Sequence, residues 1–116
     1  MHELSLAQAV VEEVVNQART HGMKRVQRVV LRIGELRAVV PDAIQLGLKA
    51  LAEGTCAAEA QFELHEDPAR ARCRNCGREF GPKEFVFACP GCGKADVEVI
   101  AGWDMIIDFI EGEDGS

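Results

Sequence analysis

The chain is short of cations, of aromatic residues and of long apolar runs, and these shortages exclude several classes of protein. Its 116 residues include 13 Lys and Arg against 19 Asp and Glu, a formal net charge of −6. Nucleic-acid binding draws on clustered cations, so we expect no nucleic-acid partner. No apolar run approaches the roughly 20 residues of a membrane span, and the N-terminus lacks a signal-peptide pattern. We therefore expect a cytoplasmic protein with no membrane partner.

The few cations are unevenly distributed along the chain. Residues 69–94 carry a small excess of positive charge, whereas the rest of the chain is strongly acidic. The segment is thus a mildly basic island on an acidic protein. A solvated surface is the simple interpretation of this island, and a docking face for an acidic partner is the functional one.

Apolar periodicity predicts an α+β fold. Residues 4–20 and 41–53 have the spacing of amphipathic helices, and Pro41 suits the first position of the second helix. Residues 26–33, 60–66 and 97–109 alternate like strands. We expect two helices on a three-stranded sheet, with a cysteine module inserted before the last strand.

The last predicted strand carries the most apolar residues of the three. Trp103 and Met105 share one face of it and are interpreted as core residues. Gly102 is expected to bend the strand or to introduce a bulge.

Two cysteine pairs form the strongest motif in the chain. Each pair has two intervening residues, and the second cysteine of each is followed by a glycine that permits a tight turn. The cysteines are Cys73, Cys76, Cys89 and Cys92. Four thiolates at this spacing suit tetrahedral Zn²⁺ in a zinc-ribbon-like module, with Phe80, Phe85 and Phe87 as its core. The module is too small to fold without metal.

Other interpretations of the cysteines stay open. A rubredoxin-like iron site fits the second pair as well, and a nucleic-acid-binding ribbon fits the nearby arginines. With all four positions filled by cysteine, the metal has no open position for water or substrate, which indicates a structural role. We find no paired acid and base, so no enzyme is expected. Cys56 stands alone and is interpreted as a small core residue.

The N-terminus offers a second, different set of ligands. His2 lies one residue from the α-amine of Met1, and this amine, the His2 amide, the His2 imidazole and the Glu3 amide offer four nitrogens. Four nitrogens in a plane suit Ni²⁺ or Cu²⁺. From the residues alone, an exposed histidine with no ligand role is the simpler interpretation.

Five stretches together resemble a known family. They are "MHELSLAQAVVEEV", "VVLRIGEL", "VPDAIQLGLKALAEGT", "CRNCG" and "CPGCG", which occur in this order along nearly the whole chain. In this combination the sequence resembles the HypA/HybF family, the nickel metallochaperones of hydrogenase maturation. Some relatives have histidines beside the cysteine pairs, but this sequence has none after His65.

The resemblance implies a function that the composition alone does not indicate. It implies Ni²⁺ as transient cargo at Met1, His2 and Glu3, and structural Zn²⁺ at the four cysteines. It implies residues 1–68 with 95–116 as a nickel-binding domain and 69–94 as an inserted zinc-binding domain. The implied partners are a maturation GTPase and the large subunit of NiFe-hydrogenase, with urease as a second recipient. We expect a monomer or a weak homodimer.

Overall fold

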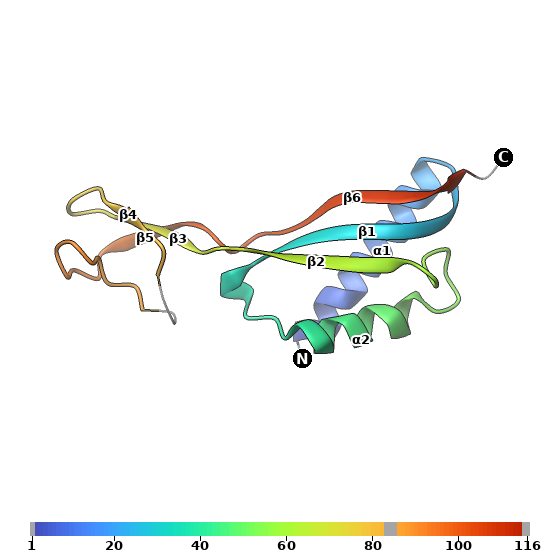
Figure 1. The fold of residues 1–116 in the computed structure, drawn as a ribbon, viewed down its shortest axis with the longest axis horizontal. Coiled ribbons are helices and arrows are strands. Elements are labelled where there is room, and N and C mark those ends of the chain that lie inside the picture. The colour runs from blue at the N-terminus through green and yellow to red at the C-terminus, as the bar shows by residue number, and fades with distance from the viewer. Residues whose placement is uncertain (1, 83–85, 115–116) are drawn as a thin grey trace. The chain divides into compact units, whose positions relative to one another are not determined.

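The computed structural model describes residues 2–82 and 86–114 and divides into two compact units (Figure 1). Unit 1 comprises Met1–Arg32, Val39–His65 and Ile106–Ser116. Unit 2 comprises Ile33–Ala38 and Glu66–Met105. The predicted zinc-binding insertion, 69–94, lies within unit 2.

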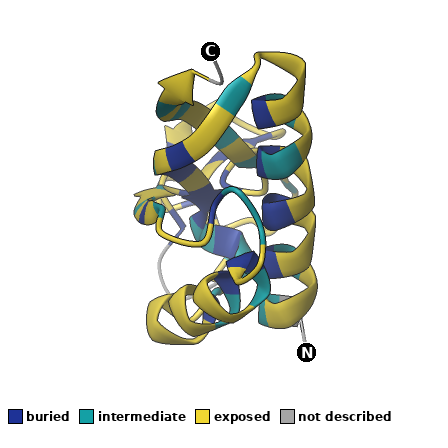
Figure 2. Ribbon diagram, turned by 90° about the vertical axis from the view of Figure 1, so that its right-hand side faces the viewer, coloured by how far each residue is buried: buried dark blue, intermediate teal, exposed yellow. Residues whose placement is uncertain are grey.

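Helix α1 (His2–Thr20) forms one side of the core of unit 1. Its apolar residues recur every three or four positions, and the resulting stripe is buried (Figure 2). The buried residues are Ala7, Val10, Val11, Val14 and Ala18. Leu4, the first residue of the predicted helix, is 52% exposed and does not belong to this buried stripe. The helix also begins two residues before its predicted start.

Helix α2 (Pro41–Ala52) packs closely against α1. Pro41 stands at its N-terminus, where a missing N–H costs nothing, and Ile44 and Leu48 are fully buried. Gly47 lets the two helices approach, since a Cβ built on it lies 3.2 Å from the Cβ of Ala7. Both helices that the sequence predicted are therefore confirmed.

A three-stranded sheet of order β2-β1-β6 contributes the other side of this core. Its strands are β1 (Met23–Gly34), β2 (Gln61–Asp67) and β6 (Met105–Asp114). Within unit 1, Arg25 binds Glu113 at 2.8 Å and Arg28 binds Glu111 at 3.0 Å, so β6 runs antiparallel to β1. In the view of Figure 1, α1 lies behind this sheet.

Unit 2 has a small sheet of its own, of order β4-β3-β5. Its antiparallel strands are β3 (Arg70–Cys73), β4 (Glu79–Phe80) and β5 (Val97–Ala101). A 3-10 turn, η1 (Glu35–Arg37), belongs to the same unit. The buried cluster of unit 2 consists of Ala71, Cys73, Phe80 and Cys89, with Val97 packed against it. Phe87 is half-buried, and Phe85 lies outside the described residues.

The predicted single strand over 97–109 is wrong. It is two strands, β5 and β6, which belong to different sheets, and the chain between them is irregular. Gly102 has a φ of 109°, a conformation that only glycine adopts readily, and its carbonyl accepts a hydrogen bond from the Leu36 N–H at 2.9 Å. Trp103 is 53% exposed and so is not a core residue, and Met105 is half-buried.

Candidate metal sites

The two cysteine pairs meet in unit 2 and form one sulfur cluster. All four sulfur atoms lie within 4.8 Å of one another. The Sγ atoms of Cys73 and Cys92 are 3.5 Å apart, and those of Cys76 and Cys89 are 3.6 Å apart. A tetrahedral site with metal–sulfur bonds of about 2.3 Å has sulfurs about 3.8 Å apart, so the cluster fits one tetrahedral ion. No other group of three or more metal-binding side chains occurs in the described part of the chain.

Each cysteine pair forms the same tight turn, which we call a knuckle: Cys73–Gly77 and Cys89–Gly93. In each, the N–H of the final glycine donates to the carbonyl oxygen of the first cysteine, at 2.8 Å and 2.7 Å. The two glycines have φ values of 78° and 75°, as the sequence predicted. This turn directs both sulfurs of a pair to the same point.

Burial separates the first cysteine of each pair from the second. Cys73 and Cys89 are buried in the core of unit 2, whereas Cys76 and Cys92 are exposed. The cluster therefore lies at the edge of a small apolar core, with one side toward solvent. An ion bound there links β3 to the segment that precedes β5 and so stabilises the whole unit.

The pKa shifts of Cys73, Cys76 and Cys89 are consistent with a bound cation. Backbone N–H groups of Cys92 and Gly91 lower the pKa of Cys89 to about 6, and the N–H of Cys76 lowers that of Cys73. The pKa of Cys76 is raised to about 11: the Arg78 N–H lowers it, but the neighbouring Cys89 and Cys73 sulfurs outweigh that effect. The neighbouring sulfurs thus oppose ionisation of the Cys76 thiol, and a divalent cation at the centre of the cluster removes that opposition.

The N-terminal residues lie on the first turn of α1. The backbone of His2 begins the helix, and Met1 lies outside the described residues. The Glu3 carboxylate accepts a hydrogen bond from the Val40 N–H at 3.4 Å, which anchors this turn beside the start of α2. The first N–H groups of an α-helix have no partner within the helix. The amide nitrogens of His2 and Glu3 are therefore not committed to intrahelical hydrogen bonds.

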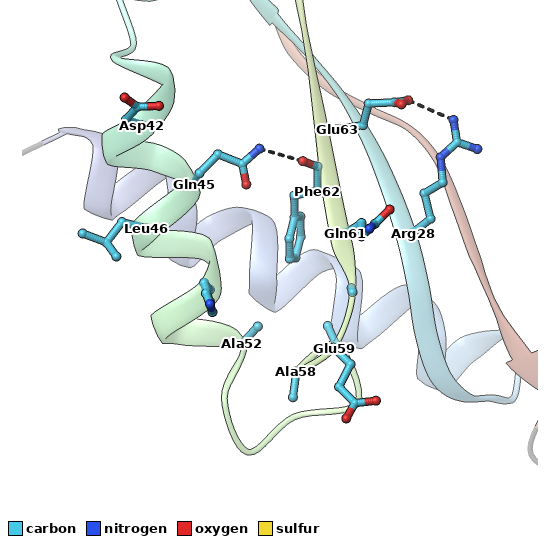
Figure 3. Close-up of a pocket in the computed structure, with 13 residues that line it drawn as sticks. Arg28, Asp42, Gln45, Leu46, Ala52, Ala58, Glu59, Gln61, Phe62 and Glu63 are labelled. Carbon is cyan, nitrogen blue, oxygen red and sulfur yellow. Dashed lines mark hydrogen bonds and ion pairs between the residues drawn. The ribbon is translucent and has the colours of Figure 1, made fainter.

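A groove in unit 1 lies between α2 and β2 (Figure 3). Its volume is about 750 Å³, and the Gln45 side chain spans it to donate to the Phe62 carbonyl oxygen at 2.7 Å. Arg28 and Glu63 form an ion pair of 2.9 Å at its rim. Among the described residues that line the groove there is neither a thiol nor an imidazole, so it offers no soft metal ligand.

Two structural features of these sites had no clear signal in the sequence. The contact between Glu3 and Val40 joins residues 37 positions apart. The side chain of Arg78 extends from one knuckle to the other and lies against Gly91. The sequence shows a basic residue after the first knuckle, but it does not show in which direction the side chain of that residue extends.

Curated relatives match this chain over nearly its full length. A hydrogenase maturation factor HypA from Moorella thermoacetica is 41% identical over 113 residues, which is 97% of this chain and 100% of that protein. A HypA from Chlorobium luteolum is 35% identical, with the same coverage of the two chains. None of the helices in the described residues is long and apolar enough to cross a membrane.

The fold agrees with a solved structure. The solution structure of the nickel metallochaperone HypA from Helicobacter pylori superposes with a TM-score of 0.72, covering 97% of each chain, at 19% identity. At that identity the likeness concerns the fold alone. A family model described as hydrogenase/urease nickel incorporation, metallochaperone, matches residues 1–112. The chain therefore belongs to the HypA family of nickel-incorporation metallochaperones, which are maturation factors and not enzymes.

Proposed function

We propose that this protein binds Ni²⁺ through Met1, His2 and Glu3 and delivers it to the large subunit of NiFe-hydrogenase. The proposed ligands are the α-amine of Met1, the amide and imidazole nitrogens of His2, and the amide nitrogen of Glu3. Urease is a second recipient on the same proposal. The proposal applies to protein whose chain starts at Met1, because an extension converts the amine into an amide.

The observation that carries the proposal is the position of His2 and Glu3 on the first turn of α1. Amide nitrogens bind Ni²⁺ only after losing their protons, which would break an internal helix hydrogen bond anywhere else. In the first turn those N–H groups have no helical acceptor, so the metal binds without disrupting the helix. Proton loss also makes the affinity rise with pH.

The same placement supports release of the ion. A terminal site allows a recipient to replace ligands one at a time, while the Glu3 side chain, bound to the Val40 N–H, holds the turn in place. A dissociation constant near 1 μM, about −8 kcal/mol, is a sensible expectation for a site that must both collect and give up its ion.

We propose that the four-cysteine cluster holds structural Zn²⁺. The sulfurs of two buried and two exposed cysteines suit a tetrahedral site whose four positions are all filled, which leaves no position for substrate. Residues 69–94 are then a zinc-binding insertion in a nickel-binding domain made of 1–68 and 95–116. A cytoplasmic location, where thiols stay reduced, agrees with this use of cysteine.

The proposed delivery involves a maturation GTPase as well as the hydrogenase subunit, and a monomer or weak homodimer as the working form. A role in hydrogenase maturation requires contact with that machinery. The basic residues of 69–94 offer one face for an acidic partner.

The test is a nickel titration of His2→Ala in protein that starts at Met1, with His21→Ala as the matched control. His21 lies just after the other end of α1, where its Nδ1 is 2.9 Å from the Gln17 carbonyl oxygen. We expect His2→Ala to lose nickel binding at least 100-fold while keeping its zinc and its helix content, and His21→Ala to bind as the native protein does. Equal binding by native protein and His2→Ala refutes the terminal site.

A further inference from the structure

The two knuckles place a cation at equivalent positions. The N–H of Cys73 donates to the carbonyl oxygen of Arg78 at 2.9 Å, and the N–H of Cys89 donates to that of Lys94, also at 2.9 Å. Arg78 and Lys94 thus each follow the glycine that ends a knuckle. Because the two positions are equivalent, Lys94 serves as the matched control for Arg78.

The side chain of Arg78 reaches the opposite knuckle. A Cβ built on Gly91 would lie 3.3 Å from both Cδ and Nη1 of Arg78 and 3.7 Å from the Cys89 sulfur. The guanidinium group therefore lies within about 7 Å of that sulfur, a range at which charges interact appreciably near a protein surface. Gly91 leaves the space that the arginine occupies, and its own N–H lies 3.4 Å from the same sulfur.

The neighbouring arginines have acidic partners. Arg72 lies 3.3 Å from Glu79 and 3.7 Å from Glu98, and Arg74 lies 3.1 Å from Asp96. Arg78 forms no ion pair with any carboxylate in the part of the chain that the structure describes. Its charge is thus directed at the sulfur cluster and is not neutralised by those carboxylates.

We propose that Arg78 is the counter-cation of the metal–thiolate centre, a positioning residue that slows loss of the metal. Four thiolates around a divalent ion leave a dianionic centre, and a fixed cation beside it stabilises the loaded site. Reaching across from one knuckle to the other, the side chain also resists their separation. The inference rests on the proposed zinc site and adds a residue that is not a ligand.

The test measures transfer of zinc from the full-length protein to an excess of a chromophoric chelator. Arg78→Gln removes the charge, Arg78→Lys keeps it, and Lys94→Gln removes the equivalent charge from the other knuckle. We expect release about three- to tenfold faster for Arg78→Gln, and within about twofold of native for the other two. Added salt should reduce the difference between native protein and Arg78→Gln, since the effect is electrostatic.

Equal release by native protein and Arg78→Gln overturns the inference, and so does an equal acceleration by Lys94→Gln. If Arg78→Gln loses its zinc during purification, the zinc content of Arg78→Lys is the deciding measurement. Native-like zinc retention by Arg78→Lys supports the role of the charge, and poor zinc retention overturns the inference. Metal content separates this outcome from the underlying proposal. Native protein without zinc refutes the zinc site itself, whereas stoichiometric zinc with unchanged release refutes only the role of Arg78.

Discussion

The Oε2 atom of Glu3 lies 3.4 Å from the backbone nitrogen of Val40, the residue that precedes α2. This contact joins the N-terminal turn of α1 to the N-terminus of the second helix. A carboxylate is favoured at both places by the helix dipoles. The side chain of Glu3 thereby positions the proposed nickel segment.

Glu3→Gln should therefore keep nickel binding. The glutamine Oε1 atom can still accept from the Val40 N–H, and the amide nitrogen of residue 3 is unchanged. We expect a nickel dissociation constant within about threefold of the native value, measured by calorimetric titration. A tenfold or larger loss, with helix content retained, would show that the carboxylate itself binds nickel.

Gly34 is predicted to tolerate no side chain. A Cβ at this position would lie 2.0 Å from the Gly102 carbonyl oxygen and 2.7 Å from the Trp103 nitrogen, and the Gly34 N–H also donates to the Asp104 carbonyl oxygen at 2.7 Å. Gly34→Ala should lower the free energy of unfolding by about 3 kcal/mol or more in denaturant titration.

Gly81→Ala is the matched control in the same unit. A Cβ on Gly81 would meet its nearest atoms at 3.6 Å, an ordinary van der Waals distance. We expect a change within about 0.5 kcal/mol. If both alanine variants unfold at the same denaturant concentration, the close approach at Gly34 does not constrain the fold.

Loss of one cysteine ligand should unfold unit 2 selectively. Cys76→Ser leaves three thiolates, which weakens the proposed zinc site, and the buried cluster around Phe80 is too small to hold the unit alone. Hydrogen exchange should show protection lost in 66–105 and kept in α1. Cys56→Ser is the control, because Cys56 lies in unit 1, and it should retain zinc. Full protection of 66–105 in zinc-free Cys76→Ser would contradict the account.

Acid should weaken the ion pair between Arg28 and Glu63. Arg28 lowers the pKa of Glu63 below its ordinary value of 4.5. A lowered folded-state pKa means that the pair stabilises the protein above the unfolded-state pKa and that this contribution disappears as pH falls through the folded value. Glu63→Gln should therefore lose less stability than native protein between about pH 5 and pH 3. Identical losses in denaturant titrations at both pH values would exclude this contribution.

The sequence predicted the features that depend on local spacing. The apolar period of α1 placed Val10 and Val14 in the core, and Pro41 marked the start of α2. The cysteine spacing identified the sulfur cluster, because two-residue gaps and following glycines allow only a tight turn. Such features involve residues close together along the chain.

The errors arose where long-range contacts decided the structure. Alternation over 97–109 indicated one strand, but the Gly102 carbonyl binds the Leu36 N–H, and Ala69 lies too close for any residue larger than glycine at position 102. The contact between Arg78 and Gly91 likewise depends on how the two knuckles face each other. Periodicity carries no information on such contacts.

X-ray absorption spectroscopy of the nickel-loaded protein, with its chain starting at Met1, tests the central claim most directly. The account predicts one Ni²⁺ in a planar shell of four nitrogen atoms, and a changed shell when the α-amine is acetylated. Sulfur in the nickel shell, or a spectrum that acetylation leaves unaltered, would place the ion elsewhere and contradict the terminal site.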